Sequence, residues 1–238
     1  LVRQLSISTF HSFCIELLKR HQAALGLEDY KIADELASVL IGKSIVEGLP
    51  PHSLLVNTRQ PYYECRRLLK LFTFLKEQRY TVSIALEKIA SYEAILDGVM
   101  ADVKLITSKF NLNLPKQRTA CKKELKAYLD DNKDYKGFFY VSFSSGKYNI
   151  GSVKEAILKA HLNNVAILKE AVSLLDVFDA KLKEQRLYTF EDAISIVGTQ
   201  LLSEGNEEVL QTILEKYHKI IIDEGQDTNA NQFQLIRT

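Results

Sequence analysis

The chain has 238 residues, of which 46% are hydrophobic and 26% are charged, and its formal net charge is +1. This balance is ordinary for a folded protein and excludes bulk disorder, while the small net charge gives no sign of a polyanionic partner. No run approaches the ~20 apolar residues that a membrane-spanning helix needs, so no membrane partner is expected. Cys14, Cys65 and Cys121 are far apart and form no CxxC pair. This pattern favours reduced thiols in a cytoplasmic protein over a disulfide framework or a zinc site.

Charge is unevenly distributed along the chain. Residues 116–159 contain ten Lys and Arg against five Asp and Glu, whereas residues 190–238 contain three against nine. The basic part could meet a polyanion, and the acidic part could hold a divalent cation. Solvated helix surfaces would give the same distribution, and both interpretations stay open.

The chain opens with a strand-like alternation over residues 2–7. Ser8 or Thr9 can then cap a helix, and apolar residues recur at helical spacing from Phe10 to about Leu25. One interpretation is a capped amphipathic helix with Phe10 in the core. The other is a nucleic-acid contact, in which the hydroxyl and the helix N-terminus bind a phosphate and an exposed aromatic ring stacks on a base.

The middle of the chain is predicted to be helical. The expected helices cover residues 32–46, with Leu36 and Leu40 facing inward, then 62–78, 82–110 with a possible break near Gly98, and 116–130. The last of these carries a basic face that could contact a nucleic-acid backbone or could simply be solvated; its members are Lys116, Arg118, Lys122, Lys123 and Lys126. Residues 137–151 break the pattern and indicate a hairpin or an aromatic loop, whose rings either stack on bases or cover a small core.

A second helical region precedes the C-terminal acidic segment. Residues 152–187 carry a continuous apolar stripe and are predicted to form the longest helix. Thr189 is a natural N-cap with Asp192 three residues on, which is a variant capping box. Helices are expected over residues 190–202 and 206–217.

An apolar run over residues 219–222 leads into Asp223 and Glu224. Such a β-branched run predicts a buried strand of a parallel sheet, and ligands of open α/β sheets collect beyond the carboxyl ends of the strands. One carboxylate there can hold Mg²⁺ through oxygen ligands, and the next can position or deprotonate a water for attack on a phosphate. The alternative is that the acids only begin a loop or cap the next helix.

Three segments resemble motifs of UvrD/Rep-type superfamily I DNA helicases. Residues 223–229 read Asp-Glu-Gly-Gln-Asp-Thr-Asn and are similar to the Walker B segment of that family, in which a larger residue is common at the position of Gly225. Residues 7–13 are similar to its STFHS motif. Residues 187–193 resemble its LDFDDLL segment in part, because Tyr188-Thr189 replaces the usual Leu-Asp.

The resemblance implies a fold and a set of domains. The fold is mainly α, with a helical subdomain inserted in an incomplete α/β domain of the RecA-like, P-loop NTPase type. Residues 1–27 would belong to the first RecA-like domain, residues 28–188 to the helical insertion, and residues 189–238 to the return into the RecA-like domain. The parent protein would be a DNA helicase that depends on ATP and Mg²⁺, translocates 3′ to 5′, and binds single-stranded and duplex DNA.

The resemblance also implies roles for individual residues. Asp223 would bind Mg²⁺ and Glu224 would activate the attacking water, while Gln226 would sense the γ-phosphate and Asp227 would support that network. The residues expected to contact single-stranded DNA are Thr9, Phe10, His11, Thr189 and Phe190.

No G-x-x-x-x-G-K-[ST] phosphate loop occurs in the sequence. Both ends interrupt an expected element, so we expect a piece of a longer protein that does not hydrolyse ATP by itself. Two alternatives remain open. One is a component of an AddA/RecB-type helicase–nuclease, which shares these motifs. The other is a non-catalytic helical interaction module in which the acids serve as caps.

Overall fold

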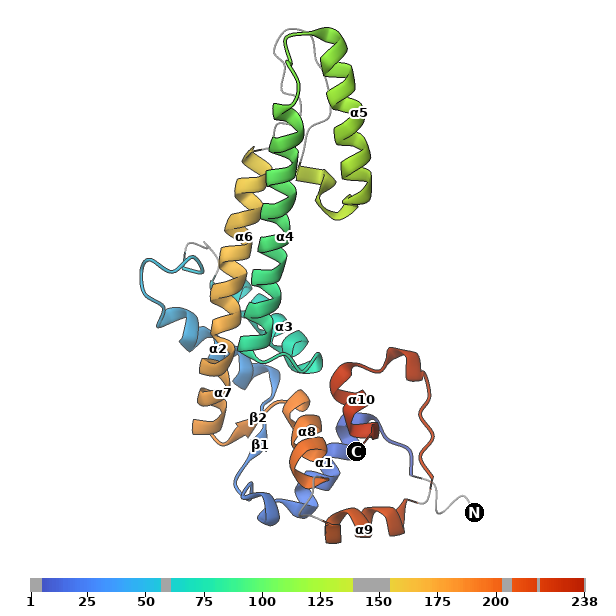
Figure 1. Ribbon diagram of the computed structural model, residues 1–238. Helices are drawn as coiled ribbons and strands as arrows, with labels where there is room; N and C mark the ends of the chain where they lie inside the picture. Colours follow the sequence, from blue (N-terminus) through green and yellow to red (C-terminus); the bar gives the residue numbers. More distant parts are fainter. Residues whose placement is uncertain (1–5, 57–60, 139–154, 203–206, 218, 238) are drawn as a thin grey trace. The chain divides into compact units, whose positions relative to one another are not determined.

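The computed structural model describes residues 6–56, 61–138, 155–202, 207–217 and 219–237 (Figure 1). These residues are mainly helical, with one two-stranded sheet, and the predicted mainly α fold class is confirmed. The chain forms two compact units. The terminal unit comprises Leu1–Ala85 and Glu170–Thr238, and the central unit comprises Leu86–Lys169.

The terminal unit combines short helices with a two-residue ladder. In chain order its elements are α1 (Phe10–His21), η2 (Ala23–Leu25), β1 (Lys31–Ile32), α2 (Glu35–Glu47), α3 (Pro61–Glu77), α7 (Leu175–Glu184), β2 (Leu187–Tyr188), α8 (Phe190–Ile196), η4 (Val197–Leu201), α9 (Glu207–Lys216), η5 (Gly225–Asp227) and α10 (Ala230–Arg237). The strands pair in parallel, with Lys31 opposite Leu187 and Ile32 opposite Tyr188. This ladder joins an early part of the chain to the segment that leads into α8.

The core of the terminal unit draws on both ends of the sequence. Its buried members are Cys14, Leu17, Leu18, Tyr188, Ala193, Ile194, Val197, Leu201, Ile213 and Leu235. They come from α1, β2, α8, η4, α9 and α10, so burial of apolar area holds these elements together. All three cysteines of the chain are free and buried, and burial raises the pKa of Cys14 to about 12, so that its thiol stays neutral.

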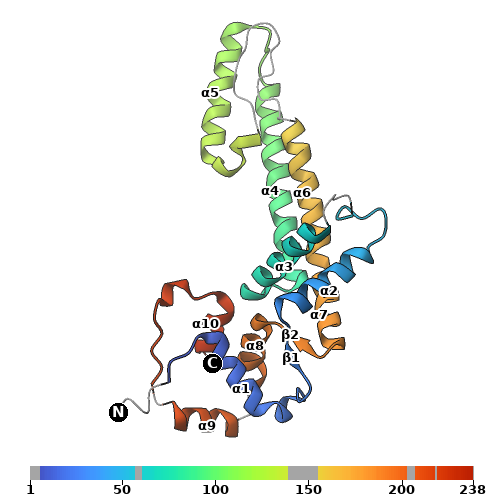
Figure 2. The same ribbon diagram turned by 180° about the vertical axis from the view of Figure 1, so that it is seen from behind.

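The central unit contains longer helices. Most of α4 (Val82–Ser108), α5 (Pro115–Asp131), η3 (Lys133–Phe138) and most of α6 (Glu155–Ser173) belong to it. α4 and α6 run side by side in Figure 1 and, from behind, in Figure 2. The buried cluster that packs α4 against α5 consists of Val99, Val103, Ile106, Cys121, Leu125 and Leu129. The predicted hairpin over residues 137–151 lies almost entirely outside the described residues.

α2 begins later than predicted and turns a different face inward. Ile32 belongs to β1, and Asp34 starts the helix because its Oδ1 accepts a hydrogen bond from the backbone N of Ala37 at 2.7 Å. With this start, Leu36 and Leu40 are 66% and 57% exposed. The prediction that they face inward was therefore wrong.

Two predictions about helix breaks were also wrong. The expected long helix over residues 152–187 is interrupted at Leu174, where the backbone N donates to the carbonyl of Ala171 at 3.1 Å in a tight turn between α6 and α7. Among the helices that the structure describes, the longest is instead α4, with 27 residues, which continues through Gly98. The apolar stripe runs across the turn at Leu174, so periodicity alone could not locate it.

The apolar run before the acidic residues does not form the predicted buried strand. Ile220 and Ile221 are 68% and 80% exposed, and in the described ranges the ladder of β1 and β2 is the only one. A central parallel strand requires neighbours along both edges and helices over both faces, and no strand of the described residues pairs with this exposed run. The strand expected over residues 2–7 is not formed at residues 6 and 7, and Ile7 is 87% exposed. Residues 1–5 lie outside the described part.

Among the described residues, no helix is both long enough and apolar enough to cross a bilayer.

Candidate nucleic-acid and nucleotide site

Two threonines begin two neighbouring helices in the same way. Thr9 and Thr189 both have extended backbones, and each is followed by a phenylalanine as the first helical residue. The Oγ1 of Thr9 accepts from the backbone N of Ser12 at 3.1 Å, and the Oγ1 of Thr189 accepts from that of Asp192 at 3.2 Å. Each hydroxyl thus satisfies one of the backbone donors that a helix N-terminus leaves open.

The two N-termini meet through an aromatic contact. α1 packs against α8, and the rings of His11 and Phe190 lie 5.7 Å apart between centroids at an interplanar angle of 83°. Phe190 is 44% exposed, whereas Phe10 and His11 are half-buried. The structure therefore brings the residues predicted from the start of the chain next to those predicted from its last quarter.

The electrostatics of these helix ends favour an anion at α1. Helix N-termini carry partial positive charge and free N–H groups. The first turn of α1 contains no acidic residue, whereas the first turn of α8 contains Glu191 and Asp192. The carboxylate of Asp192 closes the capping box by accepting from the backbone N of Thr189 at 2.9 Å.

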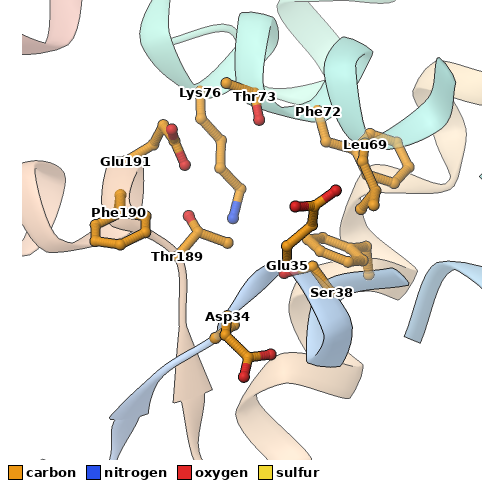
Figure 3. Close-up of a pocket in the computed structure, with 12 residues that line it drawn as sticks. Asp34, Glu35, Ser38, Leu69, Phe72, Thr73, Lys76, Thr189, Phe190 and Glu191 are labelled. Atoms are coloured by element: carbon orange, nitrogen blue, oxygen red, sulfur yellow. The ribbon is translucent and has the colours of Figure 1, made fainter. Parts of the chain in front are cut away.

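Beside Thr189 and Phe190 lies a cavity of about 250 Å³ that the sequence did not reveal (Figure 3). Its lining includes Phe72 and Phe178. The ammonium group of Lys76 points from α3 toward Thr189 (Figure 3). Lys76 pairs with Asp192 and with Asp179. Burial raises the pKa of Asp179, and the neighbouring ammonium group of Lys76 opposes this shift without cancelling it.

The acidic residues form an exposed loop. The backbone N of Glu224 donates to Oδ1 of Asp223 at 3.0 Å, and the amide of Gln226 donates to the carboxylate of Glu224. Glu224 has a left-handed backbone (φ 51°), and it is followed by the single turn η5. A Cβ on Gly225 would meet no atom within 4 Å, so this backbone has room for the larger residue that is common in the family motif.

The donors of this loop suit a hard cation. Asp223, Glu224 and Asp227 present only oxygen ligands, which Mg²⁺ prefers. Over the described ranges, no group of three or more His, Cys, Asp or Glu residues could hold a metal ion on its own. Magnesium is commonly held by one or two carboxylates together with substrate phosphates, so a single carboxylate such as Asp223 fits that mode of binding.

A buried asparagine links the acidic loop to α8. The loop leads into α10, whose start is capped by Asn229: its Oδ1 accepts from the backbone N of Gln232 at 2.9 Å. Asn231 is only 4% exposed, and its Nδ2 donates to the backbone carbonyl of Glu191 at 2.9 Å. The role of Asn231 was not predicted from the sequence. Its position four residues before Leu235, on the same face of the helix, was the only indication in the sequence that this polar side chain is buried.

The basic residues of α5 belong to the central unit. Lys116, Lys123 and Lys126 are exposed along this helix. Lys109, the residue directly after α4, pairs with Glu124 of α5 at 3.0 Å, which neutralises part of the face. The remaining ammonium groups could contact a nucleic-acid backbone.

Comparison with known proteins gives consistent matches. The sequence profile of the UvrD/REP helicase N-terminal domain matches residues 1–238. A protein of Mycoplasma pneumoniae named probable DNA helicase is 36% identical over 76 residues, which cover 32% of this chain and 14% of that protein. A Staphylococcus saprophyticus protein, named as one subunit of an ATP-dependent helicase/nuclease, is 20% identical over 315 aligned positions, which cover 99% of this chain and 26% of that protein. The chain thus spans 14% and 26% of the lengths of these two relatives.

Proposed function

The chain belongs to the family of UvrD/REP helicase N-terminal domains, and from this premise we propose that it supplies single-stranded DNA contacts and ATP-binding acids to a helicase that translocates 3′ to 5′. The observation that supports the proposal is the contact between His11 and Phe190, because it joins two segments that are far apart in the sequence and that we propose to contact DNA. The activity of the whole protein is part of the proposal, because this chain is only a fraction of its relatives' length.

The helix ends would hold the DNA strand in two ways. The N-terminus of α1, capped by Thr9, offers backbone N–H groups to a phosphate. The exposed ring of Phe190 offers a stacking surface, with the ring of His11 beside it, and stacking of this kind contributes ~1–3 kcal/mol per base. Thr189 would act mainly by fixing the start of α8, because its hydroxyl is used within the capping box.

The acidic loop would serve the nucleotide. Asp223 would hold Mg²⁺, which neutralises phosphate charge when it is bound with ATP. Glu224 would act as the general base for water, a role that contributes typically ~10²–10⁴-fold to rate. Gln226 already donates to the Glu224 carboxylate and would keep it oriented, while Asp227 would support this network.

A DNA-binding measurement tests the proposal. Fluorescence anisotropy with a labelled oligo-dT should detect binding that weakens as salt rises, since phosphate contacts release counterions. Phe190→Leu keeps an apolar side chain but removes the ring, and it should weaken binding about 5- to 100-fold. Phe233→Leu is the matched control, because Phe233 is similarly exposed, at 53%, on α10. Equal effects of the two substitutions, or no binding by the unaltered chain, would count against the proposal.

ATP hydrolysis is a separate test. The sequence has no phosphate loop, so we expect no Mg²⁺-dependent hydrolysis by this chain alone. Hydrolysis that disappears in Glu224→Gln would contradict that expectation while supporting the role of Glu224. In the whole protein, the same substitution should abolish hydrolysis and leave DNA binding in place.

A second candidate function is that of a helicase–nuclease component. It is favoured by the alignment of 99% of the chain with the Staphylococcus saprophyticus relative, whose name includes a nuclease as well as a helicase. The DNA-contacting residues would be the same in both cases. DNA cleavage by the whole protein would distinguish the helicase–nuclease from a helicase without nuclease activity.

A further inference from the structure

The side chain of Lys76 contacts the first turn of α8 through Asp192. Lys76 is in the last turn of α3, and its side chain is only 10% exposed. Its Nζ lies 2.7 and 2.8 Å from the two carboxylate oxygens of Asp192 and 2.6 Å from Oδ1 of Asp179. A lysine this deeply buried is stable only when it is paired, and here it has two carboxylates.

Asp192 connects this lysine to the start of the helix. Its Oδ2 accepts from the backbone N of Thr189 at 2.9 Å and from the hydroxyl of Thr189 at 3.0 Å. The same carboxylate is therefore shared between the capping box and Lys76. Hydrogen bonds to charged groups are shorter and stronger than neutral ones, so the ammonium group restricts the Asp192 side chain and, through it, the backbone at Thr189.

Packing restricts the lysine in turn. Its Nζ lies 5.6 Å from the centroid of the Phe178 ring, and Phe178 packs against Phe72 of α3 with ring centroids 5.1 Å apart. Lys76 thus has little freedom to follow a moving carboxylate. The start of α8 is tied through it to α3 and α7.

We propose that Lys76 is a positioning residue for nucleic-acid binding: it fixes the N-terminus of α8 so that Phe190 meets His11. This inference rests on the proposed function. Lys76 has a second effect, which is electrostatic. Asp179 and Asp192 alone would place two negative charges near a site meant for phosphate, and the ammonium group offsets one of them.

The positioning is tested without DNA by NMR of the His11 ring. The ring current of Phe190 should shift the NMR resonances of the His11 ring protons. These resonances are assigned by their disappearance from the spectrum of His11→Gln. In Lys76→Met these resonances should move toward their positions in Phe190→Leu, and Lys76→Arg, which keeps a cation, should restore them. Unchanged resonances in folded Lys76→Met would overturn the inference.

The consequence for binding is tested with a labelled oligo-dT. Lys76→Met should raise the Kd about 5- to 30-fold, and Lys76→Arg should bring it back to within about threefold of the unaltered chain. Lys70→Met is the matched control, because Lys70 is exposed on the same helix and its loss removes an equal charge. Equal weakening by both lysine-to-methionine changes would indicate general electrostatics and overturn the inference.

The remaining outcomes separate this inference from the proposed function. If the unaltered chain binds no oligo-dT, the proposed function fails, and the role of Lys76 in DNA binding fails with it. If the chain binds but Lys76→Met binds equally well, only the inference fails. Should Lys76→Met not fold, Lys76→Gln puts an uncharged amide NH₂ donor in place of the ammonium group and should give smaller changes of the same sign in both measurements. No change in either measurement would again overturn the inference.

Discussion

At Thr9, helix capping and phosphate binding can be separated by one substitution. Aspartate caps a helix as well as threonine does, so Thr9→Asp should leave the free energy of unfolding within about 0.5 kcal/mol of the original. It also places a carboxylate where we expect a phosphate, and DNA affinity should fall about 3- to 30-fold. Denaturant titration and anisotropy measure the two effects.

The control at this position is Thr9→Ser, which keeps the hydroxyl. It should change neither stability nor affinity by much. Thr9→Ala should lose about 0.5–2 kcal/mol of stability because the backbone N of Ser12 loses its partner. An affinity for Thr9→Asp equal to that of Thr9→Ser would show that no phosphate approaches this helix end.

Asp179 makes stability depend on pH in a defined direction. Its pKa is raised in the folded chain, chiefly by burial, so the stability it contributes is full below its unfolded pKa of about 3.9 and is lost as pH rises through the folded pKa. Asp179→Asn removes this dependence. The variant should therefore gain stability relative to the original as pH rises from about 4 to 7.

The size of this effect should be small, because the Asp179 side chain is 45% exposed and solvent screens its charge. Urea titrations at several pH values between these limits would measure it. A stability difference that stays constant, or that moves in the opposite direction, would contradict the assigned shift.

At the residue scale, local motifs were predictable and long-range partners were not. Thr9, as one of two candidates with Ser8, and the pair Thr189 and Asp192 were predicted as caps because capping depends on residues within one helical turn. Lys76 and Asn231 were missed because their partners lie more than a hundred and about forty positions away, respectively. Nothing in the sequence near Lys76 distinguishes it from a surface lysine.

At the element scale, α4 offers a clean test of helix propensity. Gly98 lies in its interior, and a Cβ there would meet no atom within 4 Å. Glycine in a helix interior costs about 0.5–1 kcal/mol relative to alanine. Gly98→Ala should therefore raise the free energy of unfolding of the central unit by about that amount, as measured by urea denaturation.

The matched control for Gly98 is Gly26, which ends η2. Its Cβ position is equally open, but its backbone is left-handed with φ 64°. Alanine is strained in that region, so Gly26→Ala should destabilise the terminal unit. Stabilisation by both substitutions, or by neither, would contradict the assignment of these two backbones.

Elements were predicted where their signals are local and were missed where their stability comes from partners. Most helices were located from apolar spacing and caps, because both act along the helix itself. The turn at Leu174 was hidden under a continuous apolar stripe. The run over residues 219–222 has the composition of a buried strand, yet Ile220 and Ile221 are exposed because pairing, not composition, makes a strand.

At the scale of the whole molecule, family membership was accessible from the sequence because its motifs are short and contiguous. The domain boundaries are not fixed by such motifs. The resemblance predicts an insertion over residues 28–188, and this boundary stays a prediction. The compact central unit is smaller, Leu86–Lys169, since α2, α3 and α7 pack within the terminal unit.

This organisation predicts that the two cores respond separately to mutation. Leu125 is fully buried in the central unit, and replacing a buried leucine by alanine costs about 2–5 kcal/mol. Leu125→Ala should therefore accelerate amide hydrogen exchange in α5 and in the part of α4 that packs on it. Exchange in α1 and α8 should stay unchanged, because their shared core contains no residue of the central unit.

The control for this substitution is Leu105→Ala in the same unit. Leu105 is 60% exposed, so its truncation should change stability by no more than about 0.5 kcal/mol. If Leu125→Ala accelerated exchange in α1 and α8 as strongly as in α5, the chain would unfold as one cooperative body. The DNA contacts that we propose for the terminal unit would then depend on the central core. A binding defect in any core variant would have to be tested for unfolding before it was assigned to a lost contact.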